Sequence, residues 1–267
     1  KELTKRIKSK YLDNNINIYG NLLSKFKLVL SSSLKVENYN LNIDGTIESS
    51  EINFTKALTS ELLKNKINNI NFSKIKYNLI LDSIEKNRLS LEGFYKTDNS
   101  KISKFNIQNI FSKNKSRYKI NLDLNDEVII GILNYKKNKN KLAKIAADFE
   151  LEKSKININK INYIEEKTKI ILNDLSVDKN AIKKFSNIKI ITYNDKKKNN
   201  DLNIKFGNKI FISGLLYDST NLTKILSRDS KNNIFNNLNK EIEISFKKIF
   251  SKLSEPLRDF NLLGTVK

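Results

Sequence analysis

Apolar and polar residues alternate along most of the chain, in short runs that end in Asn, Asp, Gly or Lys and then begin again. From Tyr118 to Leu124 every second residue is apolar, and the residues between are Lys, Asn and Asp. A side-chain period of two predicts a pleated strand with one apolar and one polar face. Many such runs with few helices between them predict a long, mostly antiparallel β-meander.

The expected strands cover most of the sequence. The pattern is strand-like from Asn14 to Phe54, where Asp44-Gly45 between apolar runs predicts a hairpin turn. The turns expected later are a lysine-rich one at Lys136 to Lys141 and one at Gly207-Asn208. The later strands are expected at Ile70–Phe72, Ile75–Ile84, Leu89–Tyr95, Ile102–Ile110, Tyr118–Leu124, Val128–Tyr135, Leu142–Glu152, Ile156–Tyr163, Thr168–Val177, Ile182–Tyr193, Leu202–Phe206, Lys209–Leu216, Ile242–Phe250 and Phe260–Val266.

Two segments break the alternation and predict short helices. Thr55 to Lys66 has leucines near i, i+4 spacing behind a possible Thr55 cap, and Asp218 to Ser227 has Leu222 on one side. The Asn-rich stretch Lys231 to Asn239 is expected to be a loop. The first helix predicts a seam, which divides the chain into an N-terminal β segment, 1–66, and a main β-meander, 67–267.

The predicted fold class is therefore all-β, with one to three short helices. Because strands twist, a sheet of many strands curls, so a half-open trough or a roll is expected. The alternative is a closed sandwich or barrel, in which the inward residues are ordinary core. The inward residues, which would form a lipid-groove wall if the trough is open, are Ile75, Tyr77, Leu79, Leu81, Tyr118, Ile120, Leu122, Leu124, Ile156, Ile158, Leu202, Ile204, Phe206, Ile210 and Ile212.

Composition removes most catalytic chemistry. The chain has no His, Cys, Met or Trp. This excludes serine–histidine and cysteine nucleophiles, a histidine base, and thiolate or imidazole metal ligands. The carboxylate pairs Asp126-Glu127 and Glu165-Glu166 lie in predicted turns, where solvated side chains are usual. We therefore expect no enzyme, no catalytic or metal-binding residues and no cofactor. The absence of Met indicates a segment cut from a longer protein.

The net charge of +21 has two readings. It could attract nucleic acid or an anionic membrane surface. It could equally follow from a Lys-, Asn- and Ile-rich composition, since only five of the 50 basic residues are Arg, the side chain best suited to bidentate phosphate contacts. We favour the second reading and expect no nucleic-acid partner. The run from Asp195 to Asp201 is accordingly expected to be a solvated hairpin tip.

One stretch of the chain resembles a known family. From about Ala147 to Leu226 a succession of short strands ends in Ile212-Ser-Gly214-Leu-Leu-Tyr-Asp218-Ser-Thr-Asn-Leu222. The step from a strand through Gly214 and Asp218 into an apolar helix start at Leu222 resembles the repeat region of YhdP-type AsmA-like proteins. The resemblance covers roughly a third of the chain, and its Gly-x-x-x-Asp motif is short.

The resemblance implies a specific function. AsmA-like proteins are similar to bridge-like lipid transporters, which have an N-terminal membrane anchor and a long curled sheet. The apolar inside of that sheet carries phospholipid acyl chains across the periplasm between inner and outer membranes. The chain would then be a non-enzymatic segment of an envelope protein in a Gram-negative-type bacterium. Its anchor in the inner membrane and its outer-membrane end would lie outside these residues.

A second hypothesis is a β-rich structural or surface module that recognises an anionic polymer through its lysines. The position of the lysines separates the two hypotheses. Lysines spread over the polar face of every strand would only solvate it, whereas lysines gathered at one edge or end would form a patch.

Overall fold

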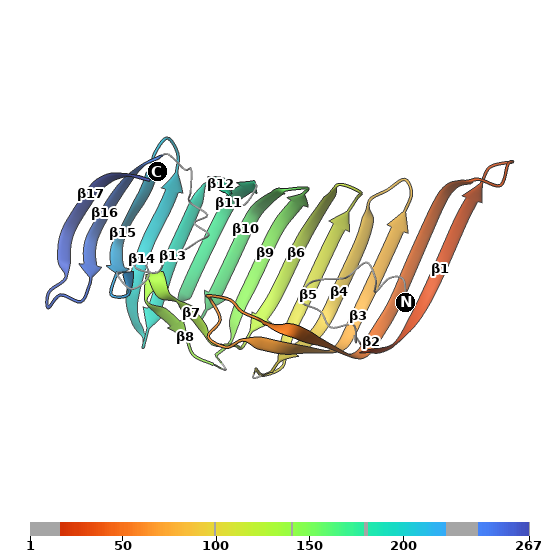
Figure 1. Cartoon of the computed structure of the whole chain (residues 1–267), viewed down its shortest axis with the longest axis horizontal. Helices are drawn as coiled ribbons and strands as arrows, with labels where there is room; N and C mark the ends of the chain where they lie inside the picture. Colours follow the sequence, from red (N-terminus) through yellow and green to blue (C-terminus); the bar gives the residue numbers. More distant parts are fainter. Residues whose placement is uncertain (1–16, 99, 140, 179–180, 223–239, 267) are drawn as a thin grey trace.

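The computed structural model describes residues 17–98, 100–139, 141–178, 181–222 and 240–266. Almost all of the regular structure in these ranges is β-strand (Figure 1). The strands are β1 (Asn17–Leu30), β2 (Val36–Leu58), β3 (Ile67–Asp82), β4 (Asn87–Thr97), β5 (Ser103–Phe111), β6 (Lys115–Leu124), β7 (Val128–Ile130), β8 (Tyr135–Lys137), β9 (Ala143–Glu152), β10 (Lys155–Glu165), β11 (Thr168–Asp178), β12 (Ala181–Lys184), β13 (Asn187–Asn194), β14 (Lys197–Phe206), β15 (Ile210–Asp218), β16 (Lys240–Phe250) and β17 (Leu257–Val266). A single 3-10 turn, η1 (Gly131–Leu133), separates β7 from β8.

Fifteen of these strands form one sheet, and along it the strands follow one another in sequence order from β1 to β17. The exceptions are β12, which pairs beside β13 on β11, and the separate hairpin β7–β8. Every neighbouring pair in the sheet is antiparallel except β15–β16, which is parallel. The all-β class is thus confirmed, while the meander is interrupted by one crossover connection.

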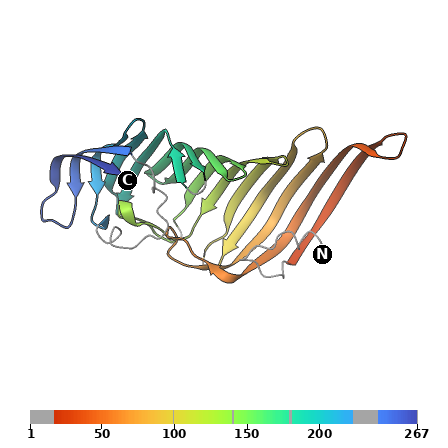
Figure 2. The same ribbon diagram turned by 45° about the horizontal axis from the view of Figure 1, so that its top comes forward.

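The sheet is long, twisted and open (Figure 2). In the part of the chain that the structure describes, β1 and β17 each have a strand on one side only, and no second sheet of similar size packs on the first. A closed barrel or sandwich is therefore not the arrangement of these residues.

Cross-strand register separates the sheet into two faces. Residues directly opposite each other on paired strands point to the same side of a sheet. Ile120 lies opposite Ile107 on one side and Ala147 on the other, and Leu202 lies opposite Ile190 and Gly214. Followed strand by strand, this register gives one face that is almost wholly apolar and one that carries most of the Lys, Asn and Asp.

The apolar face contains two buried clusters. One is centred on Ile75, Tyr95 and Phe105, where the ring centroids of Tyr95 and Phe105 are 6.3 Å apart. The other is larger and lies toward the C-terminal strands, where the hairpin β7–β8 folds over the sheet and contributes Leu133 and Tyr135.

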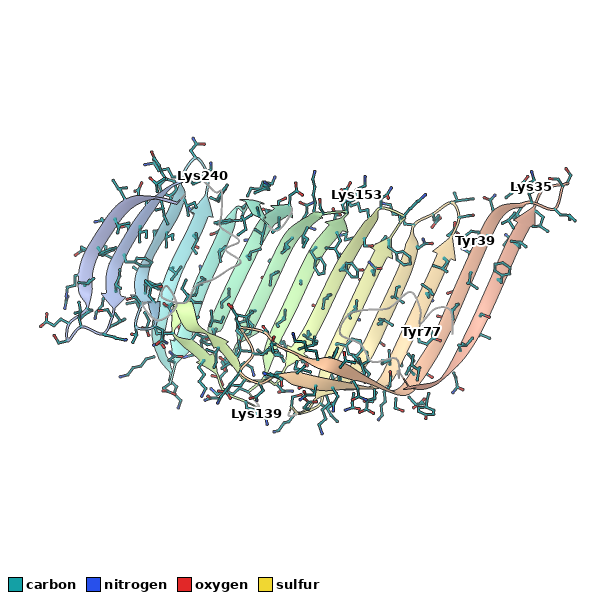
Figure 3. The ribbon with its side chains drawn as sticks, viewed as in Figure 1. Lys35, Tyr39, Tyr77, Lys139, Lys153 and Lys240 are labelled. Atoms are coloured by element: carbon teal, nitrogen blue, oxygen red, sulfur yellow. The ribbon has the colours of Figure 1, made fainter. Side chains whose placement is uncertain are left out.

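The long connections gather at one edge of the sheet. The segment 59–66 reaches β7, where the Ile129 amide donates to the Leu62 carbonyl at 2.9 Å and Leu63 forms a β-bridge with Val128. The opposite edge has mostly short turns, and Lys35, Lys153 and Lys240 lie along it, whereas Lys139 lies at the edge with the long connections (Figure 3).

The helix predicted at Thr55 to Lys66 is wrong. Strand β2 continues to Leu58, and turns and the Leu63 bridge follow it. Leu58 still pairs with Ile67 of β3, beyond the expected end of the strand region at Phe54, so sheet pairing prevailed over a weak helical spacing. The helix at Asp218 to Ser227 lies outside the described residues beyond Leu222, as do the loop at Lys231 to Asn239 and the strand residue Ile16.

The hairpin predicted at Asp44-Gly45 is also wrong, because both residues lie inside β2. Gly45 is opposite Tyr77, and a Cβ on Gly45 would lie 2.5 Å from the Tyr77 hydroxyl oxygen. The glycine thus makes room for a ring that packs over the strand and does not supply a turn. The turn at Gly207-Asn208 is confirmed, between β14 and β15.

Two expected strands are divided. The run from Val128 to Tyr135 is broken by η1 into β7 and β8, and the run from Ile182 to Tyr193 is broken into β12 and β13. In the first case Lys136 and Lys137, expected in a turn, belong to β8.

Candidate functional site

An apolar groove of about 750 Å³ lies over the C-terminal half of the sheet. Its floor crosses β11 and β13 to β17, and Ile130, Ile132 and Leu133 of the β7–η1 segment form one wall. The remaining lining residues are nearly all Ile, Leu, Phe or Tyr: Ile170, Ile190, Leu202, Ile204, Ile212, Tyr217, Leu222, Ile242, Ile244, Phe246, Ile249, Leu257, Phe260 and Leu262, with Ser219. Such a surface offers non-directional contact and few polar groups.

The expected inward residues all fall on the apolar face by register. Leu202, Ile204 and Ile212 line the groove itself. Ile210 and Phe206 are opposite each other beside it. Farther along the same face, Ile75 and Leu122 belong to the cluster around Phe105, and Tyr118 stacks on Phe149. The others on this face are Tyr77, Leu79, Leu81, Ile120, Leu124, Ile156 and Ile158.

The sheet does not bring these fifteen residues into one cavity. The residues of β3 and β6 are many strands away from β14 and β15. The arrangement is a continuous apolar surface with a defined groove near its C-terminal end.

Gly214, Asp218 and Leu222, the residues of the family-like motif, lie in three different environments. Gly214 lies in β15, where a Cβ would be 2.8 Å from the Leu202 Cα, so this position demands a glycine for close strand approach. Asp218 ends β15, is buried, and accepts hydrogen bonds from the Thr220 hydroxyl at 2.6 Å and the Asn134 amide at 2.8 Å. Leu222 lines the groove.

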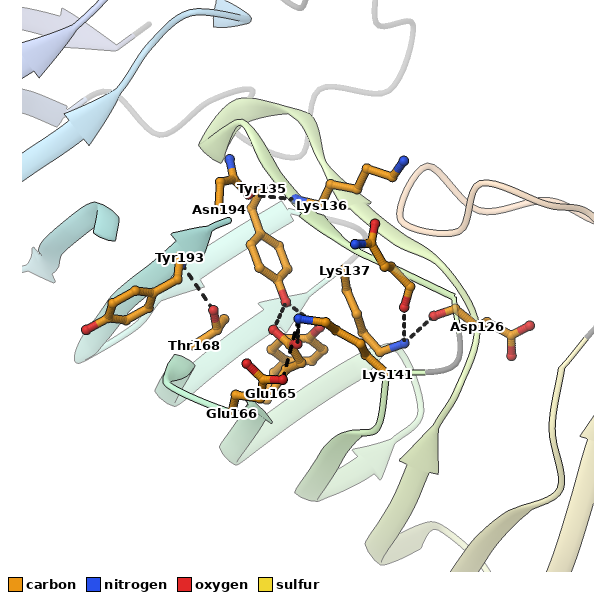
Figure 4. Close-up of polar contacts among 12 residues, drawn as sticks. Asp126, Tyr135, Lys136, Lys137, Lys141, Glu165, Glu166, Thr168, Tyr193 and Asn194 are labelled. Atoms are coloured by element: carbon orange, nitrogen blue, oxygen red, sulfur yellow. Dashed lines mark hydrogen bonds and ion pairs between the residues drawn. The ribbon is translucent and has the colours of Figure 1, made fainter. Parts of the chain in front are cut away.

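A buried polar cluster fixes the hairpin to the sheet (Figure 4). The hydroxyls of Tyr135 and Tyr163 are 2.9 Å apart, and the Tyr135 hydroxyl donates to the Glu165 carboxylate at 3.1 Å. Burial raises the pKa of Tyr163 to about 12, and burial with the neighbouring Tyr163 and Glu165 raises the pKa of Tyr135. The expectation that Glu165 is a solvated turn residue is wrong, since its exposed fraction is 6%. Glu166 is exposed as expected.

A lysine of the same hairpin is buried among backbone acceptors. Lys137 is only 1% exposed, and its ammonium donates to the Asp126 carbonyl at 2.6 Å and the Asn138 carbonyl at 3.3 Å. Burial lowers the pKa of Lys137. Next to it, ion pairs with Lys136 at 2.9 Å and Lys64 at 3.3 Å join Glu127 to β8 and to the segment 59–66. The hydrogen bond from Lys136 contributes most to lowering the pKa of Glu127.

Asparagines of β14 complete the attachment. The side-chain amides of Asn199 and Asn200 donate to the Leu133 carbonyl at 3.2 and 2.6 Å. Both side chains are buried, which corrects the expectation of a solvated tip from Asp195 to Asp201. Only the residues from Asp195 to Lys198 are exposed.

A second, polar pocket of about 830 Å³ lies on the other side of the hairpin. It is lined by Glu165 and Thr168, by four lysines, and by side chains from the turns at the sheet edge. The lysines are Lys136, Lys141, Lys167 and Lys196. Lys141 is 3.4 Å from Glu166 and 3.8 Å from Glu165.

Lysines are otherwise spread along the polar face. By register, Lys76, Lys104, Lys119, Lys144 and Lys189 lie on that face on five different strands. This distribution favours solvation of the face over recognition of a polymer.

The hairpin β7–β8 and its polar anchors were missed by sequence reasoning. Three-residue strands show no measurable periodicity. Glu165 could have been found, because it continues the period-two row of Ile161 and Tyr163 and so had to point to the apolar face. Asn199 and Asn200 gave no such signal within a Lys- and Asn-rich run.

Within the described ranges there is no group of three or more acidic side chains placed to hold a metal ion. The same ranges contain no helix that meets the length and apolar character of a membrane span. No family model, no curated protein and no solved structure matches the chain.

Proposed function

We propose that this chain binds lipid acyl chains along the apolar face of its sheet and acts as a non-enzymatic, trough-like segment of an envelope protein that carries phospholipid between two membranes. The observation that supports this proposal is the apolar groove of about 750 Å³, on a face that no second sheet of similar size covers in the part of the chain that the structure describes. Ligand pockets commonly have volumes of about 300–1,000 Å³.

The dimensions of the groove suit a lipid tail. Its floor crosses six neighbouring strands, β11 and β13 to β17. Strands are about 4.8 Å apart, so five spacings give a length of about 24 Å. One leaflet of a bilayer has a hydrocarbon depth of about 15 Å, which is the span of a lipid tail.

The free energy of removing methylene groups from water also favours a lipid tail in the groove. Each methylene removed from water contributes about 0.8 kcal/mol, so a sixteen-carbon chain gains about 12 kcal/mol before the costs of ordering are subtracted. Contact with such a wall needs no directed polar group, which agrees with the lining of the groove.

Two neighbouring leucines of β17 provide a matched test. Leu262 lines the groove and is 42% exposed, whereas Leu263 is 76% exposed and lies opposite Glu243 on the polar face. The purified protein is incubated with vesicles of phosphatidylethanolamine and phosphatidylglycerol, and bound lipid is measured by native mass spectrometry. We expect lipid on the wild type and on Leu263→Asp, and much less on Leu262→Asp.

Circular dichroism of each variant establishes that the strands are retained. A folded wild-type protein that takes up no phospholipid would refute the proposal. Equal lipid uptake by both aspartate variants would place the lipid outside this groove.

A further inference from the structure

The apolar groove and the polar pocket lie on opposite sides of one short backbone segment. Along β7 and η1, Ile129 and Gly131 line the polar pocket, while Ile130 and Ile132 line the groove. The crossover after β15 divides in the same way, with Asn221 on the pocket and Leu222 on the groove. The two spaces therefore lie side by side, separated by a single thickness of chain.

The polar pocket has cationic side chains from four different elements. Lys136 comes from β8 and Lys141 from the connection to β9. Lys167 and Lys196 come from the two-residue turns between β10 and β11 and between β13 and β14. Because β11 pairs with β13, these two turns are close neighbours at the sheet edge.

Two of these lysines have no carboxylate partner within the described residues. Lys136 is paired with Glu127, and Lys141 with the Glu165-Glu166 pair. No described carboxylate oxygen lies within 4.0 Å of the ammonium of Lys167 or Lys196. The carboxylates in the pocket lining, Glu165, Glu166 and Asp195, leave a net positive charge against the four lysines.

The wall between the two spaces is attached to the sheet by hydrogen bonds. The hairpin is fixed by the Tyr135, Tyr163 and Glu165 contacts on one strand and by Asn199 and Asn200 on another. A tight turn also limits the positions that a lysine on it can reach, which lowers the entropy lost when the side chain binds a ligand.

We propose that the polar pocket binds the phosphate-bearing headgroup of an anionic amphiphile whose tail lies in the adjoining groove, with Lys167 and Lys196 as the phosphate contacts. This inference rests on the proposed function, because it adds a headgroup site to the lipid-binding groove. A headgroup site in the polar pocket makes the C-terminal groove selective for anionic over uncharged lipids.

The test compares two amphiphiles that share a tail, dodecyl phosphate and dodecyl maltoside, with inorganic phosphate as a third probe. Binding to the full chain is measured by titration calorimetry below the micelle concentration of each amphiphile. The variant is Lys167→Gln/Lys196→Gln. Its control is Lys119→Gln/Lys189→Gln, which removes the same charge from the polar face. Circular dichroism establishes that both are folded.

We expect the Kd for dodecyl phosphate to rise about 10-fold or more in the Lys167→Gln/Lys196→Gln variant and to change less than about 2-fold in the control, since each lost charge-assisted hydrogen bond accounts for a severalfold change. The Kd for dodecyl maltoside should be the same in all three proteins. Inorganic phosphate should bind far more weakly, because it lacks the tail.

Equal weakening of dodecyl phosphate in the variant and the control would overturn the headgroup site while leaving the groove intact. Inorganic phosphate bound as tightly as dodecyl phosphate would overturn the amphiphile and assign the pocket to free phosphate. Absence of binding by both amphiphiles in the wild type would refute the groove itself, and with it the proposed function.

Discussion

Glu165 and Glu166 are adjacent in sequence and opposite in environment. Glu165 accepts a hydrogen bond from Tyr135 in the buried cluster, whereas Glu166 is exposed in the turn. Removal of a buried acceptor leaves its donor unsatisfied, which costs far more than removal of a solvated side chain.

We expect Glu165→Ala to lower the free energy of unfolding by about 1–3 kcal/mol, because the Tyr135 hydroxyl loses its acceptor. Glu166→Ala should change it by less than about 0.5 kcal/mol. Urea unfolding followed by circular dichroism measures both. Equal midpoints for the two variants would mean that the Tyr135–Glu165 contact does not stabilise the fold.

A second prediction at this scale concerns pH. Burial raises the pKa of Tyr95 to about 12 from 10.0, and its hydroxyl donates to the Asp123 carbonyl at 2.6 Å. The unfolded chain therefore loses this proton first as pH rises. Stability linked to Tyr95 is complete below pH 10 and is lost as pH rises through about 12.

Unfolding midpoints of Tyr95→Phe and of the wild type are compared at about pH 8 and about pH 11. The loss between the two pH values should be smaller in Tyr95→Phe. Tyr39→Phe, which changes a 40% exposed tyrosine, is the control and should match the wild type. If all three proteins lose stability equally, the alkaline loss has another origin.

At the scale of the strand, close approach at β14–β15 gives a clear contrast between two glycines. A Cβ at position 214 would contact the Leu202 backbone at 2.8 Å, whereas one at position 207 would meet only the Lys209 carbonyl at 3.8 Å. We expect Gly214→Ala to destabilise by about 1–3 kcal/mol because the strands must separate. Gly207→Ala should be nearly neutral in the same thermal unfolding assay, and comparable losses for both would contradict the steric argument.

Strand prediction succeeded where the pattern was local. The alternation from Tyr118 to Leu124 and from Leu202 to Phe206 placed residues on the correct face without knowledge of their neighbours. The pattern could not show contacts between segments that are distant in sequence. The parallel pairing of β15 with β16 depends on a crossover, and the fold of β7–β8 over the sheet depends on contacts with Tyr163, Asn199 and Asn200, which are distant in sequence.

Part of the candidate site was also within reach of the sequence. The alternation of apolar and polar residues alone predicted that Leu202, Ile204 and Ile212 face inward. In the structure these three residues line the groove. The polar pocket was not predictable, because its four lysines come from β8, from the connection to β9 and from two separate turns, in a chain where lysine is common. Only the sheet register brings those turns together.

At the scale of the whole molecule, β1 is the outer strand at one end of the sheet in the part of the chain that the structure describes, and its apolar side chains are exposed. Leu22 and Phe26 on one face and Leu23 on the other are each more than 60% exposed. An outer strand with free backbone groups and apolar side chains is a template for pairing with another strand. The wild-type chain should therefore self-associate in a concentration-dependent manner.

Leu23→Lys/Phe26→Lys should reduce this association, as measured by light scattering after size exclusion, because charge on an outer strand opposes strand pairing. Ile84→Lys/Leu253→Lys adds the same charge at two exposed turns, and it should leave the association unchanged. If the turn variant is as effective as the strand variant, net charge and not the outer strand governs association.

The order of the strands has a consequence for how the molecule comes apart. Each strand of the large sheet pairs mainly with the strands before and after it in sequence, so its stability approximates a sum of nearest-neighbour terms, as in repeat proteins. Opening can then begin at either outer strand and proceed inward without unfolding the centre, where β9, β10 and β11 have neighbours on both sides. Amide protection should rise from both outer strands toward the middle. The groove floor extends from β11 to the outer strand β17, so its β17 end should open with less free energy than its β11 end.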